Sequence, residues 1–182
     1  MLLNGEKVRL RPLEPEDMKD LFFWANNPEA VGEFDAFSIS QWHEVEKWFK
    51  EPDTAHGFTT LLIERKEDKA KLGIVVHYFA HPVLRNIEIG FQIWDIKERN
   101  KGYATEALKL LVEYLFTTKN IQRIQATTHT QNIAAQKVLE KCGFIKEGRQ
   151  RKSLFTKGEF QDTYIYGILR EEWKRLTQNQ QK

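Results

Sequence analysis

A basic turn that contains glycine lies between a strand-like segment and a helix-like segment near the middle of the chain. Its residues are Lys97-Glu98-Arg99-Asn100-Lys101-Gly102. The first N–H groups of a helix lack partners within the helix, and the helix dipole is positive there, so such a turn can bind an anion. Glycine lets a phosphate approach the main chain, and Arg99 and Lys101 add positive charge without blocking the amides. The turn therefore predicts a phosphate-binding site.

The residues on either side of this turn have strand and helix periodicity. Before the turn, apolar side chains alternate with other residues over 87–93, which indicates a strand. After the turn, apolar residues have the spacing of one face of a helix: Ala104, Ala107, Leu108, Leu111 and Leu115. A strand is thus expected to lead into the turn, and a long amphipathic helix is expected to begin there.

The composition is typical of a single globular domain. A chain of 182 residues can bury one sizeable core, and its formal charge of +2 does not favour nonspecific nucleic-acid binding. No apolar run reaches membrane-spanning length, and the N-terminus lacks the apolar stretch of a secretory signal. The single cysteine, Cys142, excludes an intrachain disulfide. We therefore expect a cytoplasmic protein that does not bind membranes.

The rest of the chain shows further strand and helix patterns. Strands are expected at 8–13, 57–66, 71–80, 86–94 and 121–128, with two more within 144–169 joined at Lys157-Gly158. Helices are expected at 15–25, after Ser38 or Ser40, within 131–144 and at 170–176. One domain would span residues 1–177, with a frayed tail at 178–182.

Residues 28–38 form an irregular segment that contains the rings of Phe34 and Phe37. These rings either line a substrate pocket or cover the core, and the residue types favour the second interpretation.

Two motifs resemble the signatures of the GNAT N-acetyltransferase superfamily. Residues Arg99 to Ala104 resemble its acetyl-coenzyme A signature, Q/R-x-x-G-x-G/A. Asn132, eleven residues before Gly143-Phe144, is similar to its second signature. The opening VRLRPLEPED and the ending YIYGILREEW are similar to the branch of ribosomal-protein N-terminal acetyltransferases of the RimJ/RimL type. Because motifs and ends occur in the expected order, the chain is identified as a member of this superfamily.

The resemblance implies an α/β (α+β) fold and a mode of cofactor binding. The sheet would be mixed and mostly antiparallel, with seven strands, helices on both faces and a V-shaped split between the strands at 86–96 and 122–128. The cosubstrate would be acetyl-CoA, whose pantetheine arm would bind the backbone of Ile93, Trp94, Asp95 and Ile96. The pyrophosphate would bind the amides of Arg99, Asn100, Lys101, Gly102, Tyr103, Ala104 and Thr105. Asn132 would hold the pantetheine or the adenine side of the cofactor.

Glu88 is the candidate general base. An amine must be neutral to attack a thioester, and a carboxylate can take its proton directly or through water. By strand parity Glu88 shares a face with Gly90 and Gln92, and the glycine leaves room beside the carboxylate. An ordinary exposed strand residue is the other interpretation, and the spacing does not decide between them.

The proton donor for the leaving thiolate is less clear from the sequence. Many relatives carry a tyrosine seven residues after the second-motif Asn, but this chain has Leu139 there. The role would pass to Tyr103 or to solvent, or go unfilled.

The histidines and nearby lysines give weaker signals. The five histidines do not cluster at metal-ligand spacing, so no metal site is expected. His129 is interpreted as a polar residue at a strand end. Lys137 and Lys141 either assist a cofactor phosphate or solubilise their helix.

These observations predict an N-acetyltransferase that moves acetyl from acetyl-CoA to a primary amine by direct attack in a ternary complex. The acceptor would be a protein N-terminus or a small amine. Formation of a homodimer is possible, and the sequence does not decide it. A non-catalytic acyl-CoA sensor is the alternative that Leu139 keeps open. A dinucleotide-binding domain is disfavoured because the turn lacks the G-x-G-x-x-G arrangement.

Overall fold

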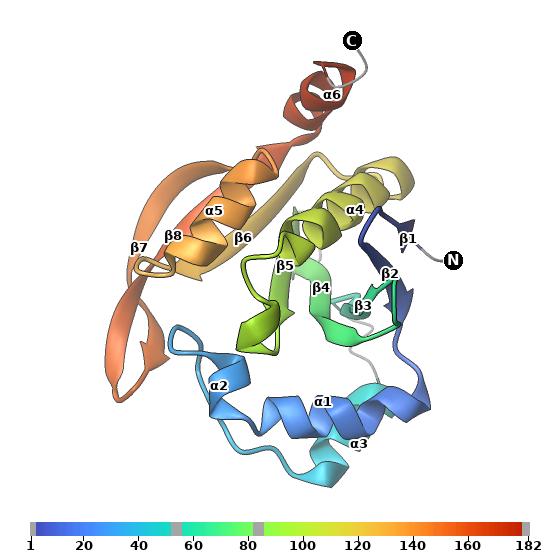
Figure 1. The fold of residues 1–182 in the computed structure, drawn as a ribbon. Helices are drawn as coiled ribbons and strands as arrows, with labels where there is room; N and C mark the ends of the chain where they lie inside the picture. The colour runs from blue at the N-terminus through green and yellow to red at the C-terminus, as the bar shows by residue number, and fades with distance from the viewer. Residues whose placement is uncertain (1–2, 52–55, 82–85, 180–182) are drawn as a thin grey trace.

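One mixed sheet organises the molecule. The computed structural model describes residues 3–51, 56–81 and 86–179, and within these ranges eight strands lie in the order β1-β2-β3-β4-β5-β6-β8-β7 (Figure 1). β5 and β6 are parallel, and the other neighbours are antiparallel. The sheet has one strand more than the expected seven, because the two-residue β1 pairs with β2.

The elements follow the predicted alternation closely. The strands are β1 (Leu3–Asn4), β2 (Val8–Pro12), β3 (Thr59–Arg65), β4 (Lys71–His81), β5 (Asn86–Ile93), β6 (Arg123–His129), β7 (Ile145–Thr156) and β8 (Glu159–Leu169). The helices are α1 (Met18–Ala25), α2 (Pro28–Val31), α3 (Trp42–Lys50), α4 (Tyr103–Thr118), α5 (Ile133–Lys141) and α6 (Arg170–Asn179), with 3-10 turns η1 (Pro15–Asp17) and η2 (Ile96–Glu98).

Helices cover both faces of the sheet and bury two separate cores. α4 and α5 lie on one face, and α1, α2 and α3 lie on the other (Figure 1). Successive strand residues point to opposite faces, so Ile63 joins the core under α4 while Leu62 joins the core under α1 and α3. Ile93 and Trp94 divide in the same way at the end of β5.

The central strand and helix form as predicted. The apolar stripe of α4 is fully buried at Ala107, Leu108, Leu111 and Leu115. Its tight packing against the sheet fixes the position of the helix N-terminus, which lies at the turn that the sequence singles out.

The segment after α1 differs from the expectation of an irregular loop. Residues Pro28–Val31 form the short helix α2, and the side chain of Asn27 caps it by accepting a hydrogen bond from the N–H of Glu29 at 3.0 Å. The loop that follows α2 reaches the tip of the β7–β8 hairpin. There Thr156 Oγ1 donates to the carbonyl of Asp35 at 3.1 Å, and Lys157 lies 3.7 Å from Glu33.

The β7–β8 hairpin and α6 form the C-terminal part of the fold. Residues Lys157-Gly158 form the tight turn of the β7–β8 hairpin, with φ values of 52° and 80°, as expected for a two-residue turn. α6 extends to Asn179, into the segment expected to fray, and residues 180–182 of that segment lie outside the described residues.

The N-terminal motif VRLRPLEPED builds a buried ion-pair network. Both terminal nitrogens of Arg11 donate to Asp17, at 2.7 and 2.9 Å, and Nε of Arg11 donates to Glu64 at 2.8 Å. Lys71 Nζ lies 2.8 Å from the same Asp17 carboxylate. The network ties β2, β3 and β4 to the start of α1.

Candidate active site

The parallel strands β5 and β6 separate after two residue pairs. Ile87 pairs with Ile124 and Glu88 with Gln125, and beyond these pairs the strands diverge, although β5 continues to Ile93. The fold therefore contains the predicted V-shaped split. A strand fork of this kind exposes main-chain groups that a ligand can bind.

The N-terminus of α4 lies beside this fork. Gly102 is the N-cap residue with φ of 87°, in the left-handed region that glycine adopts without strain, and it offers no capping side chain. The N–H groups of Tyr103, Ala104 and Thr105 therefore have no partner within the helix. All three residues, and Gly102 itself, line a cleft of about 350 Å³. No hydrogen bond joins these N–H groups to another described residue, so the turn presents main-chain donors beside an open space.

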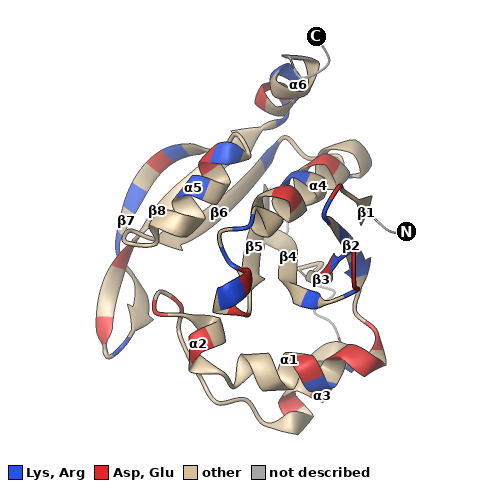
Figure 2. Cartoon of the chain, viewed as in Figure 1, with Lys and Arg blue, Asp and Glu red and all other residues tan. Residues whose placement is uncertain are grey.

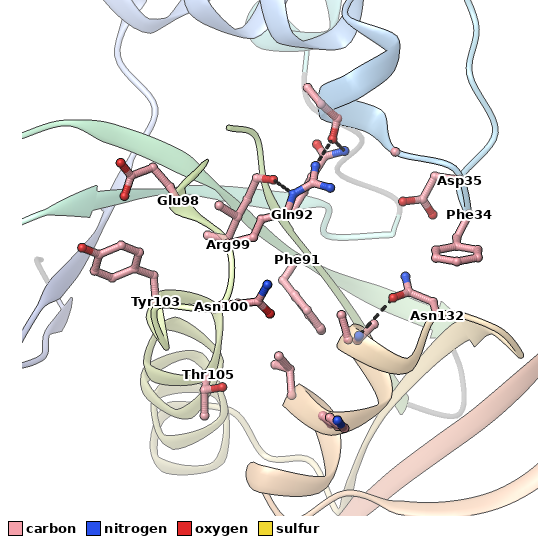
Figure 3. Close-up of a pocket in the computed structure, with 18 of the residues that line it drawn as sticks. Phe34, Asp35, Phe91, Gln92, Glu98, Arg99, Asn100, Tyr103, Thr105 and Asn132 are labelled. Atoms are coloured by element: carbon pink, nitrogen blue, oxygen red, sulfur yellow. Dashed lines mark hydrogen bonds between the residues drawn. The ribbon is translucent and has the colours of Figure 1, made fainter. Parts of the chain in front are cut away.

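The charged side chains of this turn are used differently from the expectation. Arg99 does not point into the cleft as a free cation: its guanidinium donates to the carbonyls of Ile93 at 3.0 Å and Ala30 at 2.9 Å. Lys101 pairs with Glu98 at 2.9 Å. Arg99 therefore joins the end of β5 to α2 and shapes the cleft wall (Figure 3).

The positive charge facing the cleft comes instead from the opposite wall. Lys137 and Lys141 of α5 line the cleft across from the α4 turn. In Figure 2 basic segments lie both on α5 and at the turn before α4. This arrangement suits an anionic group held between the two helices.

Eight of the predicted cofactor residues line this cleft: Ile93, Arg99, Asn100, Gly102, Tyr103, Ala104, Thr105 and Asn132. The other four, Trp94, Asp95, Ile96 and Lys101, are not in its lining. Trp94 is 3% exposed and stacks on Trp24, while the carboxylate of Asp95 caps η2 by accepting from the N–H of Lys97 at 2.8 Å. Their predicted contacts use main-chain atoms, so these contacts stay a prediction.

Asn132 has a structural role and also faces the cleft. Its Oδ1 accepts a hydrogen bond from the N–H of Ala135 at 3.0 Å and so caps α5 (Figure 3). The side-chain NH₂ remains available as a donor at the cleft surface. The second signature of the resemblance therefore fixes the start of α5 and one wall of the cleft.

Glu88 lies at the point where the strands part. It is half-buried, and Gln125 Nε2 donates to its carboxylate at 3.1 Å. The register with β4 is regular from Glu88 to Ile93, so Glu88, Gly90 and Gln92 share a face. Burial, and then the neighbouring Glu88, raise the pKa of Tyr78 on β4. Glu88 itself does not belong to the lining of the 350 Å³ cleft.

Tyr103, the side chain considered as general acid, does not point into the cleft. Leu139, which stands where relatives have a tyrosine, is 1% exposed and belongs to the core under α4 and α5. The Arg65 guanidinium lies 6.0 Å from the centroid of the Tyr103 ring. The ring points away from the space between Phe91 and Asn132 (Figure 3). Within the described lining, then, no phenol is aimed at the cleft interior.

Residues 30–35, from α2 and the loop after it, line the cleft. Segment 28–38 therefore does form a pocket wall and Phe34 is part of it, contrary to the favoured interpretation that its rings cover the core. Phe37 is 42% exposed and is not in the lining. Phe34 packs on His129 with ring centroids 5.1 Å apart, and His129 Nδ1 accepts from the N–H of Gln131 at 3.0 Å. His129 is thus a strand-end residue, as interpreted. The signal that could have pointed to Asp35 was a carboxylate in a loop rich in aromatic rings.

Neither a metal-binding cluster nor a membrane-spanning helix occurs among the described residues. No group of three or more His, Cys, Asp or Glu residues within the described ranges has the geometry of a metal site. In the same part of the chain, no helix combines the length and apolarity needed to cross a membrane.

Comparison with known proteins identifies the class. The model of the acetyltransferase (GNAT) domain family matches residues 7–145. An uncharacterized N-acetyltransferase, YnaD of Bacillus subtilis (strain 168), is 35% identical over 123 residues, covering 66% of this chain and 68% of YnaD. The putative ribosomal N-acetyltransferase YdaF of the same organism is 26% identical and covers 93% of this chain and 95% of its own.

The fold agrees with this assignment. The structure of spermidine N-acetyltransferase from Vibrio cholerae in complex with CoA and spermine superposes with a TM-score of 0.81 at 23% identity, covering 93% of this chain and 99% of that one. The chain belongs to the GNAT acetyltransferase family. It is accordingly an N-acetyltransferase that uses acetyl-CoA to acetylate an amine.

Proposed function

We propose that this enzyme binds the pyrophosphate of acetyl-CoA at the α4 turn and threads the thioester into the fork between β5 and β6. The observation that carries the proposal is the set of unpartnered amides at Tyr103, Ala104 and Thr105, which open into the cleft beside the fork. Lys137 and Lys141 would neutralise phosphate charge from the opposite wall. Contacts of the pantetheine with the backbone of residues 93–96 complete this proposal.

In this proposal the amine attacks the thioester directly within a ternary complex. Holding both reactants in one cleft makes the attack effectively intramolecular, and this positioning supplies much of the rate. Glu88, at the fork, would accept the proton of the attacking amine directly or through one water molecule. With Leu139 in the core, we propose that solvent protonates the leaving thiolate.

The acceptor is proposed as a primary amine of one of two kinds. YdaF is described as a putative ribosomal N-acetyltransferase, which favours a protein N-terminus. The Vibrio cholerae structure contains spermine, which favours a small amine.

We also propose that residues 1–177 act as one domain, that no metal takes part, and that the enzyme works in the cytoplasm. Whether the enzyme forms a homodimer is left to measurement.

A thiol-release assay tests the enzyme against the alternative of a non-catalytic acyl-CoA sensor, which the buried Leu139 favours. The purified chain is mixed with acetyl-CoA and a panel of N-terminal peptides, diamines and monoamines, and free CoA thiol is measured. We expect release above the hydrolysis rate with at least one acceptor, together with an acetylated product of the correct mass. Binding of acetyl-CoA without release across the panel would favour the sensor.

A further inference from the structure

Asp35 places a carboxylate in the cleft wall that α2 and the loop after it form. It comes from the loop after α2, and Figure 3 shows the carboxylate directed from that loop toward the interior, beside Phe34. The cleft lining contains Lys137 and Lys141 on α5 and three carboxylates. Glu98 pairs with Arg65 and Lys101, and Glu33 lies 3.7 Å from Lys157. Within the part of the chain that the structure describes, Asp35 is the one of the three without an ion pair.

The Asp35 carboxylate lacks a protein partner within the part of the chain that the structure describes. The hydrogen bond at this residue uses its main-chain carbonyl, which accepts from Thr156 Oγ1 at 3.1 Å. Arg99 is the nearby cation, but its guanidinium is occupied by the carbonyls of Ile93 and Ala30. Loss of water raises the pKa of the Asp35 carboxyl, and Arg99 and His129 oppose this rise only in part.

The loop that carries Asp35 is held on both sides. Phe34 packs on the His129 ring at 5.1 Å, and Glu33 lies 3.7 Å from Lys157 at the hairpin tip. Asp35 is therefore fixed at a defined place in the cleft wall. The residue is exposed to the open cleft, so a ligand can reach its carboxylate, and a cation bound there would form a charge-assisted hydrogen bond.

We infer that Asp35 binds a positively charged group of the acceptor other than the amine that is acetylated. The inference rests on the proposed function. The attacking amine must be neutral, so it does not need a counter-charge, whereas a second ammonium or guanidinium group stays charged and pairs with a carboxylate. The acceptor class is then a primary amine that carries a second cationic group, from either a diamine or a peptide with a basic side chain.

Matched acceptors test this inference in the wild type and in Asp35→Asn. One pair is 1,4-diaminobutane and n-butylamine, and the other is a peptide that begins Ser-Lys and its Ser-Gln counterpart. We expect the wild type to prefer the member of a pair that has a second cationic group by about tenfold in kcat/KM, the size of one charge-assisted hydrogen bond. In Asp35→Asn the KM for that member should rise about tenfold with kcat little changed, and the member without a second cationic group should be unaffected.

Glu29→Gln is the control for general loss of negative charge. Glu29 lies on α2 with an exposed side chain outside the cleft lining, so this variant should keep the wild-type preference. Asp35→Asn retains the main-chain contact to Thr156, and an unchanged dissociation constant for CoA would show that the cleft is intact. Equal kcat/KM for both members in the wild type, or an equal loss for both in Asp35→Asn, would overturn the inference.

A binding measurement separates this inference from the proposed function. Calorimetric titration of 1,4-diaminobutane and of the Ser-Lys peptide into the CoA complex requires no turnover. Binding that weakens about tenfold in Asp35→Asn but not in Glu29→Gln would support the inference, even if the thiol-release assay were silent and the enzymatic proposal failed. Binding that is absent, or equal in all three proteins, would overturn the inference, even if acetylation is observed.

Discussion

At the scale of single residues, the position of Glu88 defines what it can do. It lies at the last paired position of the fork, where Gln125 orients its carboxylate through a hydrogen bond of 3.1 Å. A group at the fork is placed for chemistry on a thioester that enters between the strands, and less well placed for holding the rest of the cofactor. Glu88 should therefore affect turnover more than cofactor binding.

Glu88→Gln tests this expectation because it keeps the shape and the contact to Gln125 while removing the basic site. We expect kcat with the true acceptor to fall about a hundredfold or more, the contribution typical of a general base, with the KM for acetyl-CoA little changed. Steady-state kinetics with each substrate varied in turn would measure both values. An unchanged kcat would remove Glu88 from the mechanism.

At the scale of elements, the α4 N-terminus carries the cofactor assignment. Acetyl-CoA at about 100 times its dissociation constant would stabilise the fold by about 2.7 kcal/mol, and in a chain of this size each kcal/mol raises Tm by roughly 2–4 °C. We expect Gly102→Asp to abolish most of this shift, because it puts bulk and negative charge at the phosphate site. Differential scanning fluorimetry with and without acetyl-CoA measures the effect.

Gly102→Asn is the matched control for that experiment. Asn has the size of Asp without its charge, and both are strained at φ of 87°, where Asn is tolerated better than most residues. The Asn variant should keep part of the thermal shift. If Gly102→Asp still responds like the wild type, phosphates do not bind at this turn.

The elements also show what the sequence could predict. Periodicity located β5 and α4 because burial repeats along each of them, and the glycine turn marked the helix start because Gly102 is required there by its backbone angle. The role of Arg99 could not be predicted, because its partner, Ala30, is brought to it only by the tertiary fold. Asp35 was missed for the same reason: the group that holds it, Thr156, is 121 residues away.

At the scale of the whole molecule, the Arg11–Asp17–Lys71 network connects the N-terminal segment to the sheet. Burial alone would raise the pKa of the Asp17 carboxyl, but hydrogen bonds from Arg11, Lys71 and the N–H of Glu14 outweigh it and hold this pKa well below its ordinary value. A carboxyl with a depressed pKa contributes stability above the pKa of the unfolded chain, about 3.9, and loses that contribution as the pH falls through the folded-state value.

Asp17→Asn should therefore lower the free energy of unfolding at pH 7 by about 3 kcal/mol, because the buried Arg11 guanidinium would lose the negative charge of the Asp17 carboxylate. The difference from the wild type should shrink as the pH falls below about 4. Urea unfolding at pH 7 and pH 3 measures both effects. Glu14→Gln is the surface control: this side chain is 65% exposed and lies 3.8 Å from Arg11, so its loss should cost less than about 1 kcal/mol.

The contact between the hairpin tip and the loop after α2 has a consequence for how the two halves of the molecule can move. It connects the β7–β8 half of the molecule to the α2 half at the mouth of the fork, in addition to the strand pairs at its closed end (Figure 1). Any spreading of the two halves at this point would have to break the contact. Almost all of this hairpin lies beyond residues 7–145, the part matched by the family model. A change in the length of this hairpin would therefore shift or remove the contact at the cleft wall without altering the α4 turn.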